Sequence, residues 1–185
     1  MESLVSSLFA HVKGKDVRQL SGCAHFNAGE TTFAGVKSVV DHLRLTPADV
    51  FVDIGSGIGN VVVQVALEAS AKVCVGIEVR GELVEIAEDI VRQHGRVLPQ
   101  LSSAMVLFSN NKLFEETANQ ALQDLACQVN HVSRVVVMEA FCPRHRQSCQ
   151  RLFCALFGPP ILLGIVVTWT SNVQNVYCYK KITTA

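Results

Sequence analysis

The chain has 185 residues, of which 49% are hydrophobic and 17% are charged, and its formal net charge at pH 7 is zero. This length and composition predict one packed globular domain rather than a disordered segment. A chain without net positive charge is not expected to bind nucleic acid strongly, because that binding scales with the number of Lys and Arg contacts to phosphate. The most apolar stretch, Ile161 to Val167, is too short to span a bilayer, so we expect no membrane-spanning helix.

The predicted elements alternate between helices and strands after a weakly patterned N-terminal segment, residues 1–27. Apolar residues at helical spacing indicate the helices, and short apolar runs indicate the strands. In chain order we predict a helix over Thr32–Leu43, a strand over Val50–Ile54, a helix over Val61–Ala69, a strand over Val73–Ile77, a helix over Leu83–Gln93, strands over Met105–Phe108 and Val135–Met138, a helix over Gln147–Phe157, and strands over Ile161–Thr170 and Val176–Ile182. This order predicts an α/β fold: a Rossmann-like, mostly parallel sheet that ends in an antiparallel hairpin and has helices on both faces.

The turn after the first predicted strand, Gly55 to Gly59, has the sequence GSGIG. Glycines let the backbone turn sharply and approach a ligand closely, and the following helix presents free N–H groups to the turn. The spacing is not the G-x-G-x-x-G of a dinucleotide fingerprint, and no lysine follows as in a P-loop. The turn therefore predicts a ligand site in which a pyrophosphate is not the main group bound.

Two acids flank this turn. Asp53, on the first strand, suits a zwitterionic or cationic ligand, and Glu78, at the end of the second strand, can accept hydrogen bonds from both hydroxyls of a ribose. This pair is the pattern expected for S-adenosylmethionine. Two alternatives stay open from these residues alone: a dinucleotide site of the NAD type, and an ordinary helix-capping turn with an exposed Glu78 and no ligand.

Five stretches resemble one known family, the disruptor-of-telomeric-silencing methyltransferases, which are histone lysine methyltransferases without a SET domain. They are AGETTF (Ala28 to Phe33), VFVDIGSGIGNVVVQVALE (Val50 to Glu68), GIE (Gly76 to Glu78), LFSNNKLF (Leu107 to Phe114) and VTWTSNVQNVYCY (Val167 to Tyr179). The resemblance implies a class I methyltransferase fold over one catalytic domain, residues 28–182. It also implies S-adenosyl-L-methionine as donor, a lysine in the globular core of histone H3 as acceptor, and a nuclear enzyme whose partner is the nucleosome, with weak DNA contact at most.

The resemblance also implies roles for individual residues. Asn110 would lie beside the transferred methyl group, and Trp169 and Tyr177 would help to form a channel for the lysine side chain; these three are the predicted catalytic residues. The predicted cofactor-binding residues are Ala28, Gly29, Glu30 and Thr31 in a closing loop, Phe51, Asp53, Gly55, Ser56, Gly57, Gly59 and Asn60 on the methionine and ribose side, and Glu78 at the ribose hydroxyls.

These roles agree with the chemistry of methyl transfer to lysine. The attacking amine must be neutral, and deprotonating a free lysine at pH 7 costs about 4–5 kcal/mol. A dry aromatic channel lowers that cost because it disfavours the ammonium form, and it also positions the nitrogen. No strong general base is then required.

The sequence departs from the family pattern at three places, the first of which is Ala28, where the family usually has a tyrosine before Gly-Glu. Lys112 stands where an aromatic residue is expected, and only 32 residues separate Glu78 from Asn110, which is a shorter interval than the family has. The missing part would carry a strand and the acidic and aromatic residues that bind adenine, and residues 95–104 contain no acid to replace them. Two alternative functions therefore stay open: a noncatalytic relative that binds the cofactor or a partner protein, and a methyltransferase acting on small molecules.

The seven cysteines are scattered and form no C-x-x-C pair. We expect buried, reduced thiols and no metal site. Cys142, His145, Cys149 and Cys154 are the one group that offers metal-ligand side chains close together in the sequence, but their spacing fits no common zinc pattern.

Overall fold

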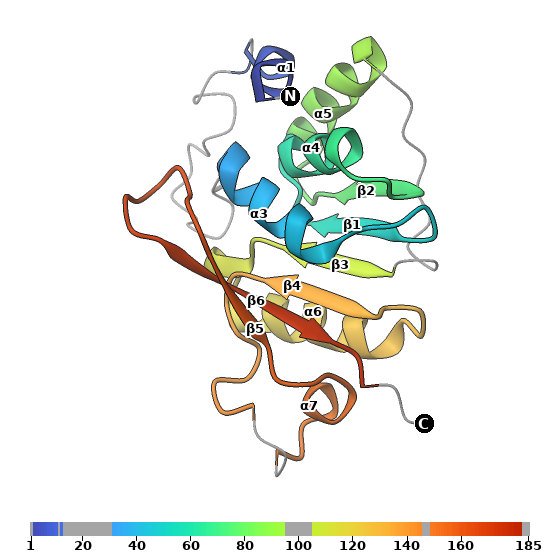
Figure 1. Ribbon diagram of the computed structural model, residues 1–185, viewed down its shortest axis with the longest axis vertical. Coiled ribbons are helices and arrows are strands. Elements are labelled where there is room, and N and C mark those ends of the chain that lie inside the picture. Colours follow the sequence, from blue (N-terminus) through green and yellow to red (C-terminus); the bar gives the residue numbers. More distant parts are fainter. Residues whose placement is uncertain (1, 11, 13–30, 95–104, 146–148, 183–185) are drawn as a thin grey trace.

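The computed structural model describes residues 2–10, 12, 31–94, 105–145 and 149–182. Helices and strands alternate along the chain, as predicted (Figure 1). The helices are α1 (Glu2–Leu8), α3 (Phe33–Leu43), α4 (Asn60–Glu68), α5 (Gly81–His94), α6 (Glu116–Gln128) and α7 (Leu152–Leu156), with a short 3-10 turn η3 (Asn111–Leu113). The strands are β1 (Val50–Ile54), β2 (Val73–Ile77), β3 (Val106–Ser109), β4 (Arg134–Val137), β5 (Ile161–Ile165) and β6 (Gln174–Lys180).

The strands form one sheet in the order β2-β1-β3-β4-β6-β5. The pairs β1–β2, β1–β3 and β3–β4 are parallel, whereas β6 runs antiparallel to both β4 and β5. Asp53 of β1 lies in register with Gly76 of β2 and Phe108 of β3. The carboxyl ends of β1, β2 and β3 therefore meet at one edge of the sheet, and the predicted fold class is confirmed.

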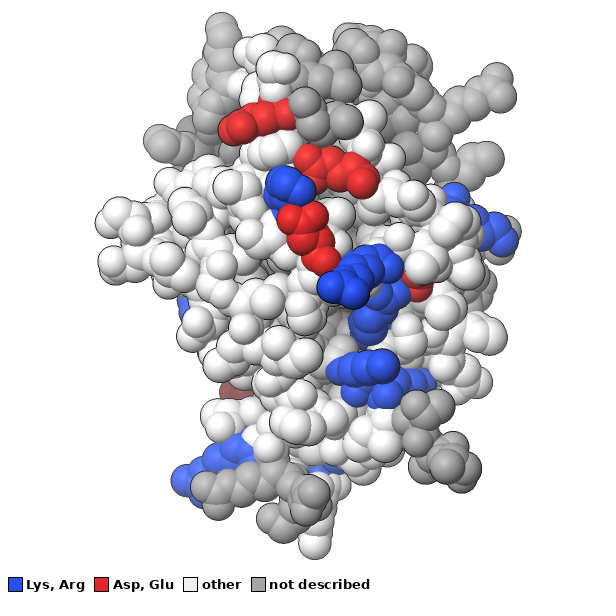
Figure 2. Space-filling model, in the orientation of Figure 1, with Lys and Arg blue, Asp and Glu red and all other residues white. Residues whose placement is uncertain are grey.

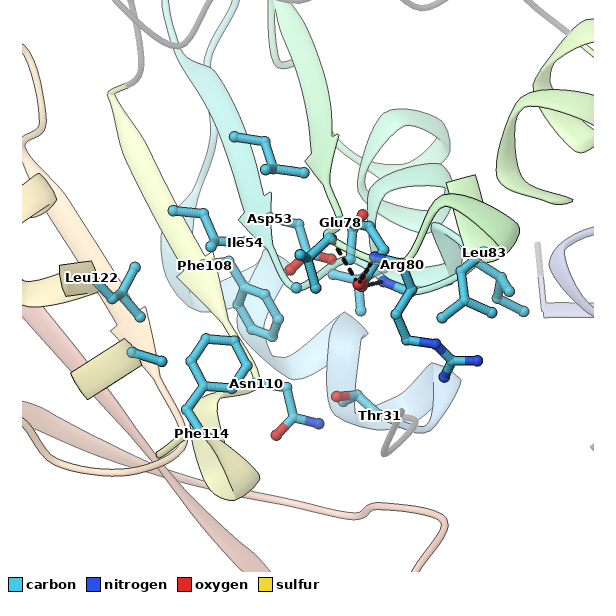
Figure 3. A pocket seen from close by; sticks show the side chains of 18 of the residues that line it. Thr31, Asp53, Ile54, Glu78, Arg80, Leu83, Phe108, Asn110, Phe114 and Leu122 are labelled. Atoms are coloured by element: carbon cyan, nitrogen blue, oxygen red, sulfur yellow. Dashed lines mark hydrogen bonds between the residues drawn. The ribbon is translucent and has the colours of Figure 1, made fainter. Parts of the chain in front are cut away.

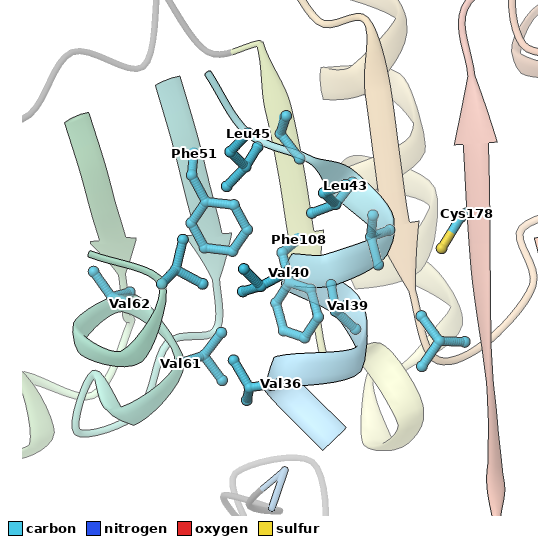
Figure 4. Packing of buried hydrophobic residues seen from close by; sticks show 14 of the residues in the cluster. Val36, Val39, Val40, Leu43, Leu45, Phe51, Val61, Val62, Phe108 and Cys178 are labelled. Atoms are coloured by element: carbon cyan, nitrogen blue, oxygen red, sulfur yellow. The ribbon is translucent and has the colours of Figure 1, made fainter. Parts of the chain in front are cut away.

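Helices cover both faces of the sheet (Figure 1). On one face α3 and α4 pack their valines against Phe51 and Phe108 of the sheet, in the cluster that Figure 4 shows. On the other face α6 and α7 bury Leu122 and Phe153 against β4 and β6. These two apolar layers hold β1 and β3 rigidly at the centre of the sheet, because buried side chains on both faces fix their position.

The helix α6 was not predicted, although its sequence carries the signal. Ala118, Ala121, Leu122 and Leu125 follow the i, i+3, i+4, i+7 spacing of an apolar helical face. The polar residues between these positions lower the mean hydropathy of the segment, and one of them, Gln123, is itself buried. This helix supplies one wall of the site described below.

The strand predicted over Ile161–Thr170 ends at Ile165. Beyond that residue the chain bonds to the start of α3 instead of continuing the sheet ladder. Thr31 forms an antiparallel bridge with Val167, and the hydroxyl of Thr32 donates a hydrogen bond of 2.6 Å to the carbonyl oxygen of Val166.

The helix predicted over Gln147–Phe157 is shorter in the structure: α7 spans Leu152–Leu156, residues 149–151 are described but not helical, and residues 147–148 lie outside the described part. Phe157 is extended and bridges to Lys181, which ends the helix. The boundary expected between residues 27 and 28 and the shortened stretch 95–104 lie outside the described residues. Within those residues β2 is an edge strand, paired on one side only, with β1.

Charged groups separate on the face of the molecule that Figure 2 draws, where Asp and Glu lie mainly in the upper half and Lys and Arg mainly in the lower half. Across the described part of the chain, none of the helices is both long enough and apolar enough to cross a membrane.

Candidate functional site

The glycine turn closes tightly over the end of β2. The N–H groups of Gly55 and Ser56 both donate to the carbonyl oxygen of Ile77, at 2.8 and 3.0 Å. Gly55, Gly57 and Gly59 have φ values of 80°, 55° and 84°. Residues with a Cβ rarely adopt this left-handed conformation, so the backbone path itself requires the three glycines. The turn ends at Gly59, which caps the N-terminus of α4.

Three backbone N–H groups hold the carboxylate of Glu78 in place. Oε2 accepts from Gly57 at 2.8 Å, and Oε1 accepts from Val79 at 2.8 Å and Arg80 at 2.9 Å (Figure 3). A carboxylate offers about four acceptor positions, so Oε2 keeps one for a ligand. The half-buried carboxylate is therefore a fixed acceptor at the mouth of the turn, with one position left for a ligand hydroxyl rather than the two expected from the sequence.

Asp53 is an acid in a nearly dry position. It is 2% exposed, and burial raises its pKa to about 8, with a further contribution from the nearby Glu78 carboxylate. A cation placed beside it would favour the ionised form and lower this pKa. The position therefore suits a ligand with an ammonium group.

These groups line one pocket of about 480 Å³ at the carboxyl ends of β1, β2 and β3. That volume lies in the range of small-molecule sites. Figure 3 shows Asp53, Glu78, Asn110 and Phe114 around this pocket. The lining residues are Thr31, Asp53, Ile54, Gly55, Ser56, Gly57, Ile58, Asn60, Val61, Ile77, Glu78, Val79, Arg80, Leu83, Phe108, Asn110, Phe114, Glu115, Ala118, Ala121, Leu122 and Leu125.

Sequence reasoning missed the wall opposite the glycine turn, which Phe114 and the apolar face of α6 form. Phe114 packs directly against Gly55: a Cβ added to Gly55 would lie 2.9 Å from Cζ of that ring. The signal in the sequence was the α6 periodicity that starts just after Phe114. Because α6 was not predicted, neither was its contribution to the site.

The two adjacent asparagines have different environments. Asn110 follows β3 and lines the pocket. Asn111 is 1% exposed; its Oδ1 accepts from the N–H groups of Met138 and Glu139, at 2.9 and 2.7 Å. Its Nδ2 donates to Asn119 Oδ1 at 2.6 Å and to the carbonyl oxygen of Glu139. Asn111 therefore ties β3 to the segment after β4, and this bracing holds Asn110 at the pocket.

The structure brings together eight of the predicted site residues. They are Thr31, Asp53, Gly55, Ser56, Gly57, Asn60, Glu78 and Asn110. Phe51 is instead fully buried in the core, where it packs against Phe108, because its side chain leaves β1 on the face covered by α3 and α4. Gly59 shapes the turn without lining the pocket. Ala28, Gly29 and Glu30 lie outside the described residues.

The two predicted channel residues are not among those that line the pocket. Trp169 is 40% exposed, in the segment between β5 and β6. Tyr177, on β6, packs partly against the core cluster beside α6 and α7. The bridge between Thr31 and Val167 links the segment that carries Trp169 to a residue lining the pocket.

Solved structures share this architecture. A putative RNA methyltransferase from Pyrococcus horikoshii superposes with a TM-score of 0.62 at 12% sequence identity, over 98% of this chain and 98% of that one. An RNA methyltransferase from Salinibacter ruber, solved with S-adenosyl-L-homocysteine, gives a TM-score of 0.54 at 19% identity, over 78% of this chain and 88% of that one. The strand order, the glycine turn and these likenesses define a class I S-adenosylmethionine-dependent methyltransferase fold.

Sequence comparison indicates one family within this class. Residues 9–99, just under half of the chain, match the sequence model of the family described as "Histone methylation protein DOT1". Three relatives are each described as a "Histone-lysine N-methyltransferase, H3 lysine-79 specific". The proteins from Cryptococcus neoformans and Drosophila melanogaster are each 30% identical over 62% of this chain, and cover 22% and 8% of their own lengths. The Candida albicans protein is 26% identical over 96% of this chain and 16% of its own length.

The chain thus spans between 8 and 22% of the length of these relatives. The chain also has no residue at some positions within the aligned region. The alignment with the Candida albicans protein has 208 positions but covers 96% of the 185 residues, so about 30 positions have no counterpart here. A deficit of this size agrees with the short interval between Glu78 and Asn110.

Proposed function

We propose that this chain is an S-adenosyl-L-methionine-dependent protein-lysine N-methyltransferase that acts on a lysine in the globular core of histone H3. The observation that carries the proposal is the convergence of Asp53, Glu78 and Asn110 on one pocket of a DOT1-family fold. The relatives named for H3 lysine-79 support the choice of substrate. A nuclear location and the nucleosome as partner follow from that substrate and belong to the same proposal.

The residues present fit the donor. The free acceptor position on Glu78 suits a ribose hydroxyl, and the buried carboxyl of Asp53 suits the ammonium of a methionine moiety. When bound, S-adenosyl-L-methionine supplies an electrophilic methyl group. The glycine turn admits the ligand close to the backbone, and Asn110 orients polar groups at the reacting end. Phe114 and the apolar face of α6 exclude water, which disfavours a charged lysine nitrogen.

One observation favours a second candidate, a noncatalytic relative that binds the cofactor or a partner protein. The part of the sheet that would carry the adenine-binding acid is shortened, and β2 is the edge strand of the described sheet. Lys112, at the position of an expected aromatic residue, forms an exposed ion pair with Glu139, at 3.0 Å. A small-molecule methyltransferase has no comparable observation in its favour.

Titration calorimetry of the full chain tests the cofactor assignment. We expect S-adenosyl-L-methionine and S-adenosyl-L-homocysteine to bind, and NAD to bind much more weakly. Equal or tighter binding of NAD would overturn the assignment. Transfer of a labelled methyl group to nucleosomes then separates the two candidates: binding without any transfer is the result that favours the noncatalytic relative.

A further inference from the structure

Three cysteine thiols converge at the connection between β4 and β5, away from the pocket residues. The Sγ atoms of Cys142, Cys149 and Cys154 all lie within 4.8 Å of one another, and those of Cys142 and Cys149 are 3.9 Å apart. Cys142 and Cys149 belong to the loop after β4, whereas Cys154 lies on α7. Cys142 and Cys154 are buried, and Cys149 is half-buried, so an ion could reach the group from outside.

The spacing of the sulfur atoms suits a bound metal. In a tetrahedral zinc site each Zn–S bond is about 2.3 Å long, which places two sulfur ligands about 3.8 Å apart. The Cys142–Cys149 separation of 3.9 Å is close to that value. A disulfide would instead need the two sulfur atoms at about 2 Å. Three thiolates are ligands that select zinc over magnesium or calcium.

A histidine beside this group has the environment of a metal ligand. Nε2 of His145 lies 2.8 Å from the carbonyl oxygen of Phe157, and its other ring nitrogen, Nδ1, is buried without a hydrogen-bond partner among the described residues. A ligating histidine usually donates one N–H to such a carbonyl and directs the other nitrogen to the metal. Nδ1 of His145 is not within the 4.8 Å group, so the ring must shift to complete a tetrahedron.

We propose that Cys142, Cys149 and Cys154 bind one Zn²⁺ ion as thiolates, with His145 as the fourth ligand. The ion closes the loop between β4 and α7 and braces the aromatic cluster formed by Phe153 and its neighbours. Three thiolates and Zn²⁺ together carry one negative charge. Arg151, whose guanidinium donates to the carbonyl oxygen of Phe141 at 3.0 Å, places a positive charge on the same loop. This site is structural and does not depend on the proposed methyltransferase activity.

The test uses the full chain, reduced and stripped of metal with a chelator. We expect one equivalent of Zn²⁺ to bind, and Co²⁺ to give a thiolate-to-metal charge-transfer absorption whose intensity corresponds to three sulfur ligands. Zn²⁺ should displace the Co²⁺ and raise the unfolding temperature, because an ion that binds only the folded chain stabilises it. Absence of stoichiometric binding, or an intensity that fits fewer than three thiolates, would overturn the proposal.

Single substitutions identify the ligands. Cys149→Ser, which alters the half-buried member of the group, should weaken Zn²⁺ binding at least tenfold, since even outer-shell changes around zinc cost about 10–100-fold. His145→Ala should also weaken it. Cys127→Ser is the matched control: Cys127 is half-buried on α6, outside the group, and its replacement should leave the Co²⁺ spectrum unchanged. Circular dichroism of each variant checks that it folds.

Three results would contradict the ligand assignment. An unchanged Co²⁺ spectrum in Cys149→Ser would exclude that thiolate and with it the three-thiolate site. Recovery of the native chain with Cys142 and Cys149 joined in a disulfide, detected by mass spectrometry before reduction, would assign the pair to redox chemistry instead. Unchanged Zn²⁺ affinity in His145→Ala would remove the histidine from the site.

Discussion

Glu78 is the residue whose loss should most directly weaken the binding of S-adenosyl-L-methionine. Glu78→Ala removes the acceptor for a ribose hydroxyl and leaves the N–H of Gly57 without its partner. A hydrogen bond to a charged group contributes about 1.5–3 kcal/mol, so calorimetry should show affinity falling at least tenfold. The control is Glu82→Ala, a nearby exposed acid paired with Arg80, which should bind as the parent does. If Glu78→Ala also binds like the parent, the glycine turn does not hold this cofactor.

Replacing Asn110 or Asn111 by alanine should change different properties: methyl transfer for Asn110 and folding stability for Asn111. Asn110 lines the pocket, so its loss should reduce methyl transfer far more than cofactor affinity, because misplacing the reacting groups lowers the rate directly. From the sequence alone we would expect Asn111→Ala to be the milder change. That expectation concerns turnover and stays a prediction; the buried Asn111 makes four hydrogen bonds, so its loss should act on stability as well.

Asn111→Ala should therefore lower the free energy of unfolding, by about 2 kcal/mol or more, because it strands buried backbone N–H groups. Denaturant unfolding of both variants, beside calorimetry and a labelled-donor assay, separates the two roles. A fully stable Asn111→Ala chain would refute the bracing role, and an Asn110→Ala chain with normal turnover would remove Asn110 from the reacting end.

Asp53 should make the affinity for S-adenosyl-L-methionine depend on pH. Burial, with a smaller contribution from Glu78, raises its pKa to about 8, so the carboxyl of the empty pocket is mostly protonated at pH 7. An ammonium group binds the ionised carboxylate better, so binding at pH 7 should release a proton, and affinity should rise as pH increases toward about 8. Calorimetry in buffers with different ionisation enthalpies measures that proton. Asp53→Asn should abolish both the release and the pH dependence; the same release in this variant would assign it to another group.

Among the elements, the sequence predicted best the strands that are continuous apolar runs. Val50–Ile54 and Val73–Ile77 became β1 and β2 with unchanged bounds, although only β1 is buried at four of its five residues, as expected for a strand covered on both faces. The amphipathic helix α6 was missed because only one of its three buried residues, Leu122, is a large apolar side chain, and the other two are Gln123 and Ala126. The wall formed by Phe114 was missed with it, since tertiary packing alone brings that ring to Gly55.

The start of α3 offers a test of how the segment after β5 is held. The Thr32 hydroxyl accepts from the N–H of Gly35 at 3.1 Å and donates to the carbonyl oxygen of Val166 at 2.6 Å. Thr32→Val keeps the shape but loses both bonds, so the free energy of unfolding should fall by about 1–2 kcal/mol. Cofactor affinity should fall as well, because the neighbouring Thr31 lines the pocket. Thr32→Ser retains the hydroxyl and should behave like the parent, measured by denaturant unfolding and calorimetry; equal stability of the valine variant would contradict this role.

At the scale of the whole molecule, the described residues bring Asp53, Glu78 and Asn110 around one pocket, while the interval from Glu78 to Asn110 is shorter than the family pattern predicts. β1 and β3 are packed on both faces and position Asp53 and Asn110. The outer side of β2, where the family pattern would add a strand, has no partner strand among the described residues. Affinity for the cofactor should therefore depend mainly on the groups around the glycine turn.

The proposed substrate predicts that the enzyme recognises a folded histone surface and not a short peptide. A lysine in the globular core of a histone is presented by a folded surface, so methyl transfer to intact nucleosomes should be faster than transfer to a short peptide with the same lysine. The chain has 16 Lys and Arg against 16 Asp and Glu, so its contact with DNA should be weak and its binding to nucleosomes should weaken as salt rises. A labelled-donor assay on both substrates over a range of salt concentrations measures this. A peptide methylated as fast as nucleosomes would refute recognition of the folded surface, while strong, salt-resistant nucleosome binding would show that contacts other than phosphate hold the complex.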